Sequence, residues 1–372
     1  MMAELSDKSH NKKRMLVMAG GTGGHIFPAL AVAAEMKKQG WDLCWLGAQG
    51  KMEEKLVPQY GLPLKLISIQ GIRGGGWLRF IAAPFKIAQA LVQSLRIVKQ
   101  YKPDVVLGMG GFVTGPGGLA ARLFRVPLVI HEQNAIAGTT NRILSWLAAD
   151  VLSAFPDTFG HHQVVVVGNP IRQELLALHQ QRLPFLKGQP LKILVVGGSL
   201  GAQIFNQVLP DTIACLQSQR QGQYQVFHQA GKGNQEAVLA AYKQNDVVDD
   251  VVVEEFIDDM ARAYQWADMI VCRAGALTVS ELAVMGLPSI LVPYPHAIDD
   301  HQTRNAQFLA AAGAALIMPQ TEFNSTALAA QILHIAQQED KLTLMSEAAY
   351  RLAEMHAAEN VAAICCKAAK SF

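Results

Sequence analysis

The chain has 372 residues, of which 51% are hydrophobic and 17% are charged, with 31 glycines and a formal net charge of +2. This composition excludes a disordered chain and is typical of an α/β enzyme, and the length predicts two domains. Because the net charge is so small, nothing in the overall electrostatics indicates a nucleic-acid partner, and none is expected.

The cysteines and the N-terminus favour a protein that is made and kept in the cytoplasm. None of the five cysteines has C-x-x-C spacing, so we interpret them as reduced thiols. The first residues, MMAELSDKSHNKKR, lack the apolar region of a signal peptide. No stretch reaches the roughly 18 unbroken apolar residues of a membrane-spanning helix.

The first half of the chain alternates between strand and helix patterns. RMLVMAGG (14–21) predicts a buried strand and a glycine turn, and IFPALAVAAEMKKQG (26–40) predicts a helix that stops at Gly40. WDLCWLG (41–47) predicts the next strand, and the apolar runs at 103–111, 126–134 and 150–155 continue the alternation. This rhythm predicts a parallel sheet with helices on both faces.

A second series of strands begins near residue 191. It comprises LKILVVGG (191–198), YQVFHQAG (224–231), VVVEEFI (251–257), MIVCRAG (269–275) and PSILVPYP (288–295). The sequence therefore predicts two doubly wound domains. Their boundary is expected near Asn169, which can cap a helix whose first position is Pro170.

Each series carries a glycine loop after its first strand, AGGTGGHIFPA (19–29) and VGGSLGAQIFN (196–206). Such a loop leaves N–H groups unpaired at a helix N-terminus, where phosphate oxygens bind. The pattern of a dinucleotide-binding oxidoreductase fits poorly, because its third glycine position holds Ile26 in the first loop and Gln203 in the second. The loops therefore indicate other phosphate-bearing ligands.

Five segments together resemble the MurG family of bacterial glycosyltransferases: GGTGGHIFPALAVA, GMGGFVTGPGG, IHEQNAIAGTTNR, GGSLGAQIFN and CRAGALTVSELAVMGLPSILVPYP. The five segments in this order are highly specific for the family, and the resemblance runs from about residue 14 to the C-terminus. It implies the α/β GT-B fold, in which two Rossmann-like doubly wound domains face a cleft. The implied organisation is a flexible tail (1–13), an acceptor-binding, membrane-facing domain (14–169), a UDP-GlcNAc-binding domain (170–350) and a C-terminal helix (351–372) that can pack back on the first domain.

The resemblance implies that N-acetylglucosamine passes from UDP-GlcNAc to the C4 hydroxyl of the muramoyl sugar of lipid I, with inversion, giving lipid II and UDP. Such a single displacement needs a base, stabilisation of the leaving diphosphate and a grip on the sugar. We interpret His25 as the base, because a neutral imidazole accepts a proton near neutral pH. The alternative is a histidine that only caps or packs at a helix start. Glu132 is a weaker candidate for orienting the base or the acceptor.

The resemblance also implies the donor site. Arg172 and Ser199 would contact the diphosphate, and Glu281 would accept the ribose hydroxyls. Gln302 would hold sugar hydroxyls. At His301 the family often has a second glutamine, so no sugar contact is inferred for this position. The full donor set, with Ile257 beside the uracil, is Thr22, Gly23, Gly24, Asn134, Arg172, Ser199, Ile257, Ala276, Leu277, Thr278, Val279, Ser280, Glu281 and Gln302.

Neither a metal nor another cofactor is expected. The chain contains no D-x-D pair to hold a divalent ion on the diphosphate, and its Asp-Asp pairs (249–250, 258–259 and 299–300) are adjacent residues that we interpret as solvated loop charge. An arginine and a helix dipole would take the place of the metal.

The acceptor of this family carries a polyprenyl chain, so the enzyme is expected to work as a peripheral protein on the cytoplasmic face of the bacterial inner membrane. Segment 72–100 has the residues of an interfacial anchor for anionic lipid at its first end, whereas Leu91, Leu95 and Val98 are expected on the core. The candidate membrane contacts are Trp77, Phe80, Ile81, Phe85 and Lys86. The candidate sites for the lipid I diphosphate are Gly110, Gly111, Gly117 and Gly118.

Two other functions stay open from the sequence. One is another UDP-GlcNAc enzyme of this architecture, with a different acceptor or with epimerase activity. The other is a non-catalytic protein that binds a nucleotide sugar or a lipid precursor, in which His25 would matter only for folding. Cell-wall and division proteins are possible further partners.

Overall fold

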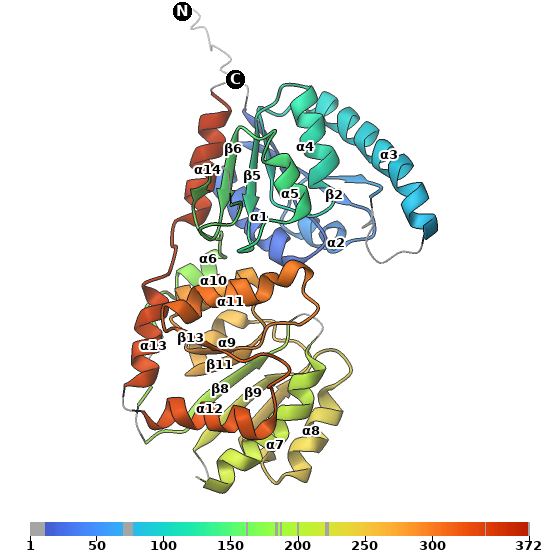
Figure 1. The fold of residues 1–372 in the computed structure, drawn as a ribbon. Helices are drawn as coiled ribbons and strands as arrows, with labels where there is room; N and C mark the ends of the chain where they lie inside the picture. The colour runs from blue at the N-terminus through green and yellow to red at the C-terminus, as the bar shows by residue number, and fades with distance from the viewer. Residues whose placement is uncertain are drawn as a thin grey trace, which may run out of the picture. The chain divides into compact units, whose positions relative to one another are not determined.

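The computed structural model describes residues 12–69, 77–160, 163–182, 185–186, 188–198, 201–219, 223–338 and 340–370, without the side chains of residues 77–83 and 298. It divides into two compact units, one of residues 1–133, 137–170 and 356–372 and one of residues 134–136 and 171–355. Each unit holds one parallel sheet with helices around it (Figure 1). The expected α/β class with two doubly wound sheets is confirmed.

The described part of the first unit has a seven-stranded sheet of order β3-β2-β1-β4-β5-β6-β7. Its strands are β1 Arg14–Met18, β2 Asp42–Ala48, β3 Leu64–Ile67, β4 Val105–Gly108, β5 Leu128–Glu132, β6 Asp150–Ser153 and β7 Val165–Val166. Its helices are α1 Gly23–Lys38, α2 Met52–Gln59, α3 Trp77–Tyr101, α4 Thr114–Leu123, α5 Thr139–Leu144 and α14 Ala357–Ala368.

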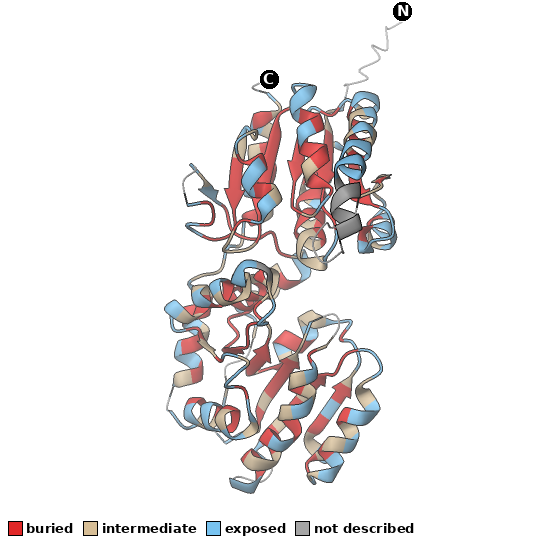
Figure 2. Ribbon diagram, turned by 45° about the vertical axis from the view of Figure 1, so that its right-hand side comes forward, coloured by how far each residue is buried: buried red, intermediate tan, exposed pale blue. Residues whose placement is uncertain are grey.

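The side chains of β1 alternate between two cores, as the period of a strand buried on both faces requires. Met15 and Val17 pack with α1, α2 and α14 on one face, and Leu16 and Met18 pack with α3, α4 and α5 on the other. Figure 2 shows the central strands mostly buried, whereas both residues of the edge strand β7 are exposed. The glycine loop after β1 therefore leaves the sheet at its carboxyl edge, between two filled layers.

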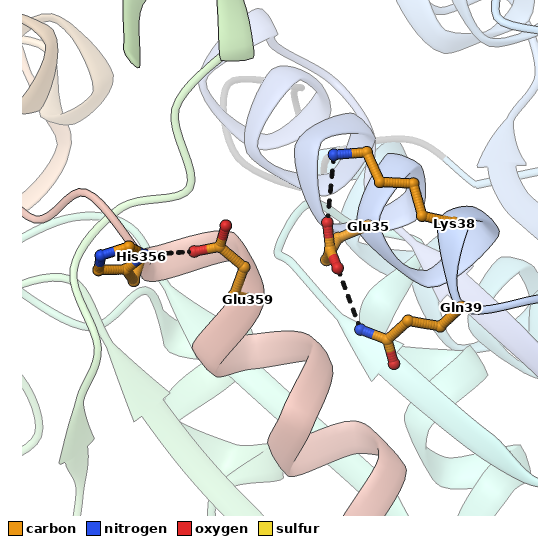
Figure 3. Close-up of polar contacts among 5 residues, drawn as sticks. All are labelled: Glu35, Lys38, Gln39, His356 and Glu359. Atoms are coloured by element: carbon orange, nitrogen blue, oxygen red, sulfur yellow. Dashed lines mark hydrogen bonds and ion pairs between the residues drawn. The ribbon is translucent and has the colours of Figure 1, made fainter. Parts of the chain in front are cut away.

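The C-terminal helix α14 forms part of this first core, since Val361, Ala362 and Cys365 are fully buried beside α1. The outer surfaces of α1 and α14 carry short-range polar pairs (Figure 3). Glu35 accepts hydrogen bonds from Lys38 at 3.3 Å and from Gln39 at 3.2 Å. Exposed pairs of this kind contribute little to stability, so the apolar face of α14 holds it in place.

The described part of the second unit has a six-stranded sheet of order β10-β9-β8-β11-β12-β13. Its strands are β8 Leu191–Val196, β9 Tyr224–Gln229, β10 Val251–Glu254, β11 Met269–Cys272, β12 Ser289–Leu291 and β13 Ala315–Ile317. Its helices are α6 Gln173–Leu176, α7 Gln203–Gln219, α8 Gln235–Gln244, α9 Met260–Trp266, α10 Ala276–Met285, α11 His301–Ala311, α12 Ser325–Gln337 and α13 Lys341–Tyr350, with 3-10 turns at Val248–Asp250 and Ile298–Asp300.

The same alternation builds the second unit. Ile193 and Val195 pack with α7, α8 and α12, whereas Leu194 and its neighbour Ile270 are buried on the opposite face, where α9 contacts β8. The predicted strands all form here, but the expected helix at Asn169–Pro170 does not. The helix begins at Gln173, with Arg172 as its N-cap, and is only four residues long.

Candidate active site

The first glycine loop leads directly into α1. Thr22 is the N-cap, and its carbonyl accepts the N–H groups of His25 and Ile26 at 3.1 and 3.2 Å. The N–H groups of Gly23 and Gly24 precede these first intrahelical bonds and, by helix geometry, have no acceptor within the helix. The start of α1 therefore has the arrangement that binds anionic groups.

The imidazole of His25 lies against the loop backbone. Its Nδ1 is 3.2 Å from the carbonyl oxygen of Gly20 and 3.5 Å from the hydroxyl of Thr22. We assign the proton to Nδ1, since a carbonyl can only accept, and this leaves Nε2 as an acceptor. A side chain on Gly110 would come within 3.0 Å of Nε2, so the glycine makes room for the ring.

The glycines of GMGGFVTGPGG divide into two groups. Gly110 and Gly111 form a turn with positive φ (97° and 89°), and a side chain on Gly111 would collide with the carbonyl of Gly20. Gly117 and Gly118 instead lie buried within α4, where side chains would collide with Met18 and Leu144 respectively.

The expectation that Gly117 receives the acceptor diphosphate is wrong, because its N–H already donates to the carbonyl of Val113 at 3.2 Å. Gly118 likewise serves close packing, since a side chain there would collide with Leu144. Since Gly110 and Gly111 lie in the turn beside His25, they alone stay candidates for the diphosphate.

Glu132 has a structural role in the described contacts. It is 3% exposed, and one carboxylate oxygen accepts the N–H of Gly138 at 3.1 Å and the amide of Asn141 at 2.9 Å. Its neighbour His131 is fully buried with Nε2 2.9 Å from the carbonyl of Gly168, and burial lowers the pKa of this imidazole to about 4. His131 is therefore neutral and structural.

The second unit has a cavity of about 710 Å³ at the carboxyl edge of its sheet. This volume suits a small-molecule ligand. The cavity is bordered by the second glycine loop and by the start of α10, where the N–H of Val279 donates to the carbonyl of the N-cap Gly275 at 2.9 Å. The N–H groups of Ala276, Leu277 and Thr278 come before this first bond and form a second anion-binding helix start.

Glu281 on α10 is the centre of a buried polar triad. Its Oε1 accepts from Arg172 at 3.1 Å and its Oε2 accepts from the hydroxyl of Tyr264 at 3.0 Å. Burial raises the pKa of Glu281, and the pairing with Arg172 opposes that rise. The structure thus brings two expected donor residues together, and Tyr264 is a partner that sequence analysis missed.

Tyr264→Phe removes one donor from this carboxylate. We expect the free energy of unfolding to fall by about 1–3 kcal/mol, because a buried charged acceptor loses a hydrogen bond. Urea denaturation of the variant beside Tyr60→Phe, an exposed tyrosine at 49%, measures the difference. A midpoint unchanged in both variants would contradict this reading of the triad.

Arg273 is a second residue that sequence analysis missed, although it lies within a quoted segment. It lines the cavity and stacks on the rings of Phe205 and Tyr294, at 5.0 and 5.4 Å. Its guanidinium donates to Gln320 at 2.7 Å. Gln302 lines the same cavity, and its Oε1 accepts the N–H of Tyr294 at 2.9 Å. The side-chain amide of Gln302 is thereby oriented by the loop that follows β12.

Asn134 belongs by its contacts to the second unit, which corrects the expectation that it comes from the first domain. The fully buried Asn305 on α11 holds it there. The amide of Asn305 donates to Asn134 at 3.3 Å and to the carbonyl of Ala274 at 3.2 Å, and its oxygen accepts the N–H of Ala135 at 2.8 Å. Asn305 therefore joins this segment to the residues just before α10.

Some of the expected residues lie outside the described part of the structure: Ser199 entirely, and the side chains of Trp77, Phe80 and Ile81. Phe85 and Lys86 on α3 are exposed, whereas Val98 is buried and Leu91 and Leu95 pack against the core as expected. Ile257 is 4% exposed and follows β10, and Ser280 donates to the carbonyl of Ala276 at 3.0 Å.

Among the residues that the structure describes, no three or more His, Cys, Asp or Glu side chains gather in a way that could hold a metal ion. Within the same ranges, none of the helices has the length and apolar character needed to cross a bilayer.

Comparison with known proteins decides the family. Residues 15–153 match the glycosyltransferase family 28 N-terminal domain and residues 192–361 match its C-terminal domain. A protein of Shewanella baltica is 54% identical over 353 residues, which are 95% of this chain and 97% of the relative. The chain belongs to glycosyltransferase family 28, among the MurG enzymes.

Curated relatives of this MurG-family enzyme share one name. The S. baltica protein and a 53% identical one from Shewanella oneidensis are both named UDP-N-acetylglucosamine--N-acetylmuramyl-(pentapeptide) pyrophosphoryl-undecaprenol N-acetylglucosamine transferase. The crystal structure of Acinetobacter baumannii MurG is 43% identical, with a TM-score of 0.80 over 95% of this chain and 99% of its own. The GT-B fold class is thereby confirmed, and the protein is a glycosyltransferase.

More distant structures share the fold alone. A putative UDP-N-acetylglucosamine 2-epimerase from Listeria monocytogenes has a TM-score of 0.69 at 13% identity, over 97% of this chain and 98% of its own. At this distance the likeness shows two Rossmann-like sheets and carries no activity across.

Proposed function

We propose that this MurG-family enzyme transfers N-acetylglucosamine from UDP-GlcNAc to the C4 hydroxyl of the muramoyl sugar of lipid I, giving lipid II and UDP. The observation that carries the proposal is the 54% identity, over nearly the whole of both chains, to relatives named for this transfer. Two anion-binding helix starts, at α1 and α10, supply sites for two diphosphate-bearing substrates.

In the proposed mechanism His25 is the general base. The C4 hydroxyl attacks the anomeric carbon on the face opposite the UDP, and its proton passes to Nε2. The contact of Nδ1 with the carbonyl of Gly20 supports this role, since it favours the tautomer in which Nε2 accepts. Gly110 and Gly111, whose turn lies beside the ring, would bind the acceptor diphosphate.

The donor lies, in this proposal, in the cavity of the second unit. The α10 start and Ser199 bind the diphosphate, and the helix dipole stabilises the charge that develops on UDP as it leaves. Glu281 accepts the ribose hydroxyls, Ile257 lies beside the uracil, and Arg172 adds a guanidinium next to Glu281. Gln302 and Asn134 bind the sugar, with Thr22, Gly23 and Gly24 completing the site.

Product formation from UDP-GlcNAc and a short-chain lipid I analogue, followed by mass detection of the disaccharide, tests the proposed reaction. We expect a product heavier than the acceptor by one N-acetylglucosamine residue. If folded protein binds UDP and consumes UDP-GlcNAc without forming this product, the acceptor assignment is wrong. Conversion of UDP-GlcNAc alone to its 2-epimer would support an epimerase instead.

The transfer is expected to proceed without a divalent ion. In the proposal, backbone N–H groups and Arg172 stabilise the leaving diphosphate, so chelation removes nothing that the reaction needs. Initial rates with and without excess EDTA, at equal ionic strength, are expected to agree. A loss of activity that returns on adding Mg²⁺ or Mn²⁺ would overturn this expectation.

We further propose that the enzyme binds the anionic inner membrane through the first unit, on its cytoplasmic face. The helices α3, α4 and α5, which contact one another in sequence, carry the exposed apolar side chains Phe85, Ile87, Val92, Leu119, Leu123 and Ile143, and the exposed Trp146 follows α5. Lys86 and Arg122 on the same helices are exposed, and Arg125 follows α4. This combination is the chemistry of an interfacial anchor.

Phe85→Glu is expected to weaken binding to vesicles that contain anionic lipid. Phe85 is 77% exposed, so a carboxylate there leaves the fold intact but opposes insertion and is repelled by anionic headgroups. Vesicle sedimentation measures the effect. Leu344→Glu, at a residue of α13 that is 57% exposed, is the matched control. Equal binding of both variants and the wild type would remove Phe85 from the membrane contact.

A further inference from the structure

One buried carboxylate outside the proposed substrate contacts lies directly beneath the first glycine loop. Glu53, in the first turn of α2, is 0% exposed. Its Oε1 accepts the N–H of Ala48, the last residue of β2, at 2.9 Å. Its Oε2 accepts the N–H of Gly21 in the glycine loop at 3.0 Å. A buried carboxylate is costly unless it is hydrogen-bonded, and here both oxygens bind backbone N–H groups.

The backbone around Glu53 is shaped to fit its side chain. A side chain on Gly20 would collide with the carboxylate, and one on Gly47 would lie 2.8 Å from its Cγ. Glycine is therefore needed at positions 20 and 47 to make room for Glu53, whether or not a ligand also needs it there. The carboxylate thus joins the carboxyl ends of β1 and β2 at one fixed separation.

The loop that Glu53 holds is the one that positions His25. The carbonyl of Gly20 accepts from Nδ1 of His25, and the same residue packs against Gly111 so closely that no side chain fits there. Glu53, through Gly20 and Gly21, is thereby connected to both the imidazole and the turn beside it. A displacement of the loop by a fraction of an ångström would move the proton acceptor.

We propose that Glu53 is a positioning residue for glycosyl transfer, which acts by fixing the glycine loop so that Nε2 of His25 is held at the acceptor hydroxyl. This inference rests on the proposed role of His25 as general base. Glu53 itself touches no substrate. Its loss is expected to lower kcat with little change in the affinity for UDP, because the proposed donor contacts of the second unit stay intact.

A double-mutant cycle with His25 tests this inference. Glu53→Gln keeps the size of the side chain but replaces one acceptor oxygen by an NH₂ group, which cannot accept a backbone N–H. We expect kcat to fall roughly 10- to 100-fold, and the dissociation constant of UDP to stay within about threefold. In the His25→Ala background the same substitution is expected to lower kcat no further, because the group that it positions is absent.

Glu54→Gln is the matched control. Glu54 is the next residue of the same helix, and its carboxylate also accepts a backbone N–H, that of Gly50 at 2.6 Å, but it is exposed. Its kcat is expected to match the wild type. If Glu53→Gln behaves as this control does, or if its effect is equally large with and without His25, the positioning role is wrong while the role of His25 stands. If His25→Ala alone keeps full activity, the proposed base is wrong, and positioning through it falls too.

A second variant covers a failure of Glu53→Gln to fold. Glu53→Asp keeps both oxygens but withdraws them by one methylene, and it is expected to show a smaller loss of kcat that also disappears without His25. In the wild-type protein, hydrogen exchange at the Gly21 amide is expected to be slower than its intrinsic rate by about 100-fold or more. Exchange of that amide at the intrinsic rate would show that Glu53 does not hold the loop.

Discussion

His25→Ala is expected to lower kcat by about 10²–10⁴-fold, the usual contribution of a general base. The substitution removes the only group of the α1 start that can accept a proton from the acceptor hydroxyl in the proposed mechanism. The contacts of Nδ1 with Gly20 and Thr22 are on the loop surface, so the fold and the affinity for UDP are expected to persist. Steady-state rates with a lipid I analogue, together with UDP binding by calorimetry, measure the two effects separately.

His334→Ala is the control for this experiment. His334 is an exposed histidine on α12 whose ring lies 3.0 Å from the side-chain amide of Gln338, and the variant is expected to have wild-type rates. A His25→Ala enzyme with a rate close to that of this control would mean that another group, or water, takes the proton. If the wild-type protein binds the lipid precursor but shows no transfer activity, the result would instead support a non-catalytic binding protein.

Gly111→Ala is expected to reduce activity by more than about 100-fold, the cost of misplacing a catalytic group by about 1 Å. The residue has φ = 89°, a conformation that costs an alanine about 1–3 kcal/mol. In addition its Cβ would collide with the backbone of Gly20, which accepts from His25. The substitution therefore forces apart the two loops that enclose the imidazole.

Gly50→Ala separates these two effects. Gly50 also has positive φ, at 69°, but a side chain there would meet nothing within 4 Å. Both variants are expected to lose a similar amount of thermal stability, because alanine is strained at positive φ. Only Gly111→Ala is expected to lose activity as well. If the two variants keep the same specific activity, the close packing of the loops does not matter for catalysis.

The strands and the class of fold could be read from the sequence because they depend on local patterns. Runs such as LKILVVGG are apolar over the full length of a strand buried on both faces, and their glycines mark the turns. The helix expected at Pro170 was wrong because a capping pattern gives only a local preference. The chain there stays extended through Arg172, which pairs with Glu281, 109 residues away.

The supporting residues of the site could not be read in this way. Tyr264 and Asn305 act only through partners that the fold brings to them, and Glu53 lies in a helix whose sequence, MEEKLVPQ, reads as an ordinary polar surface. Likewise the motif GMGGFVTGPGG does not reveal which glycines bend the backbone and which make room for packing. Gly110 and Gly117 differ in that respect only because α4 lies on Met18 and Leu46.

The place of α14 in the first core has a consequence for the order in which the protein is made. A ribosome releases the strands β1 to β7 first, together with α1 and α2, but the part of this face that α14 covers, over β4, β5 and β6, stays open to water until residues 357–368 emerge. The second unit, built almost entirely from residues 171–355, has all its parts before then. The half of the protein synthesised first is thus the half completed last, and a nascent chain that is cut short before residue 357 presents a large apolar surface to chaperones and proteases.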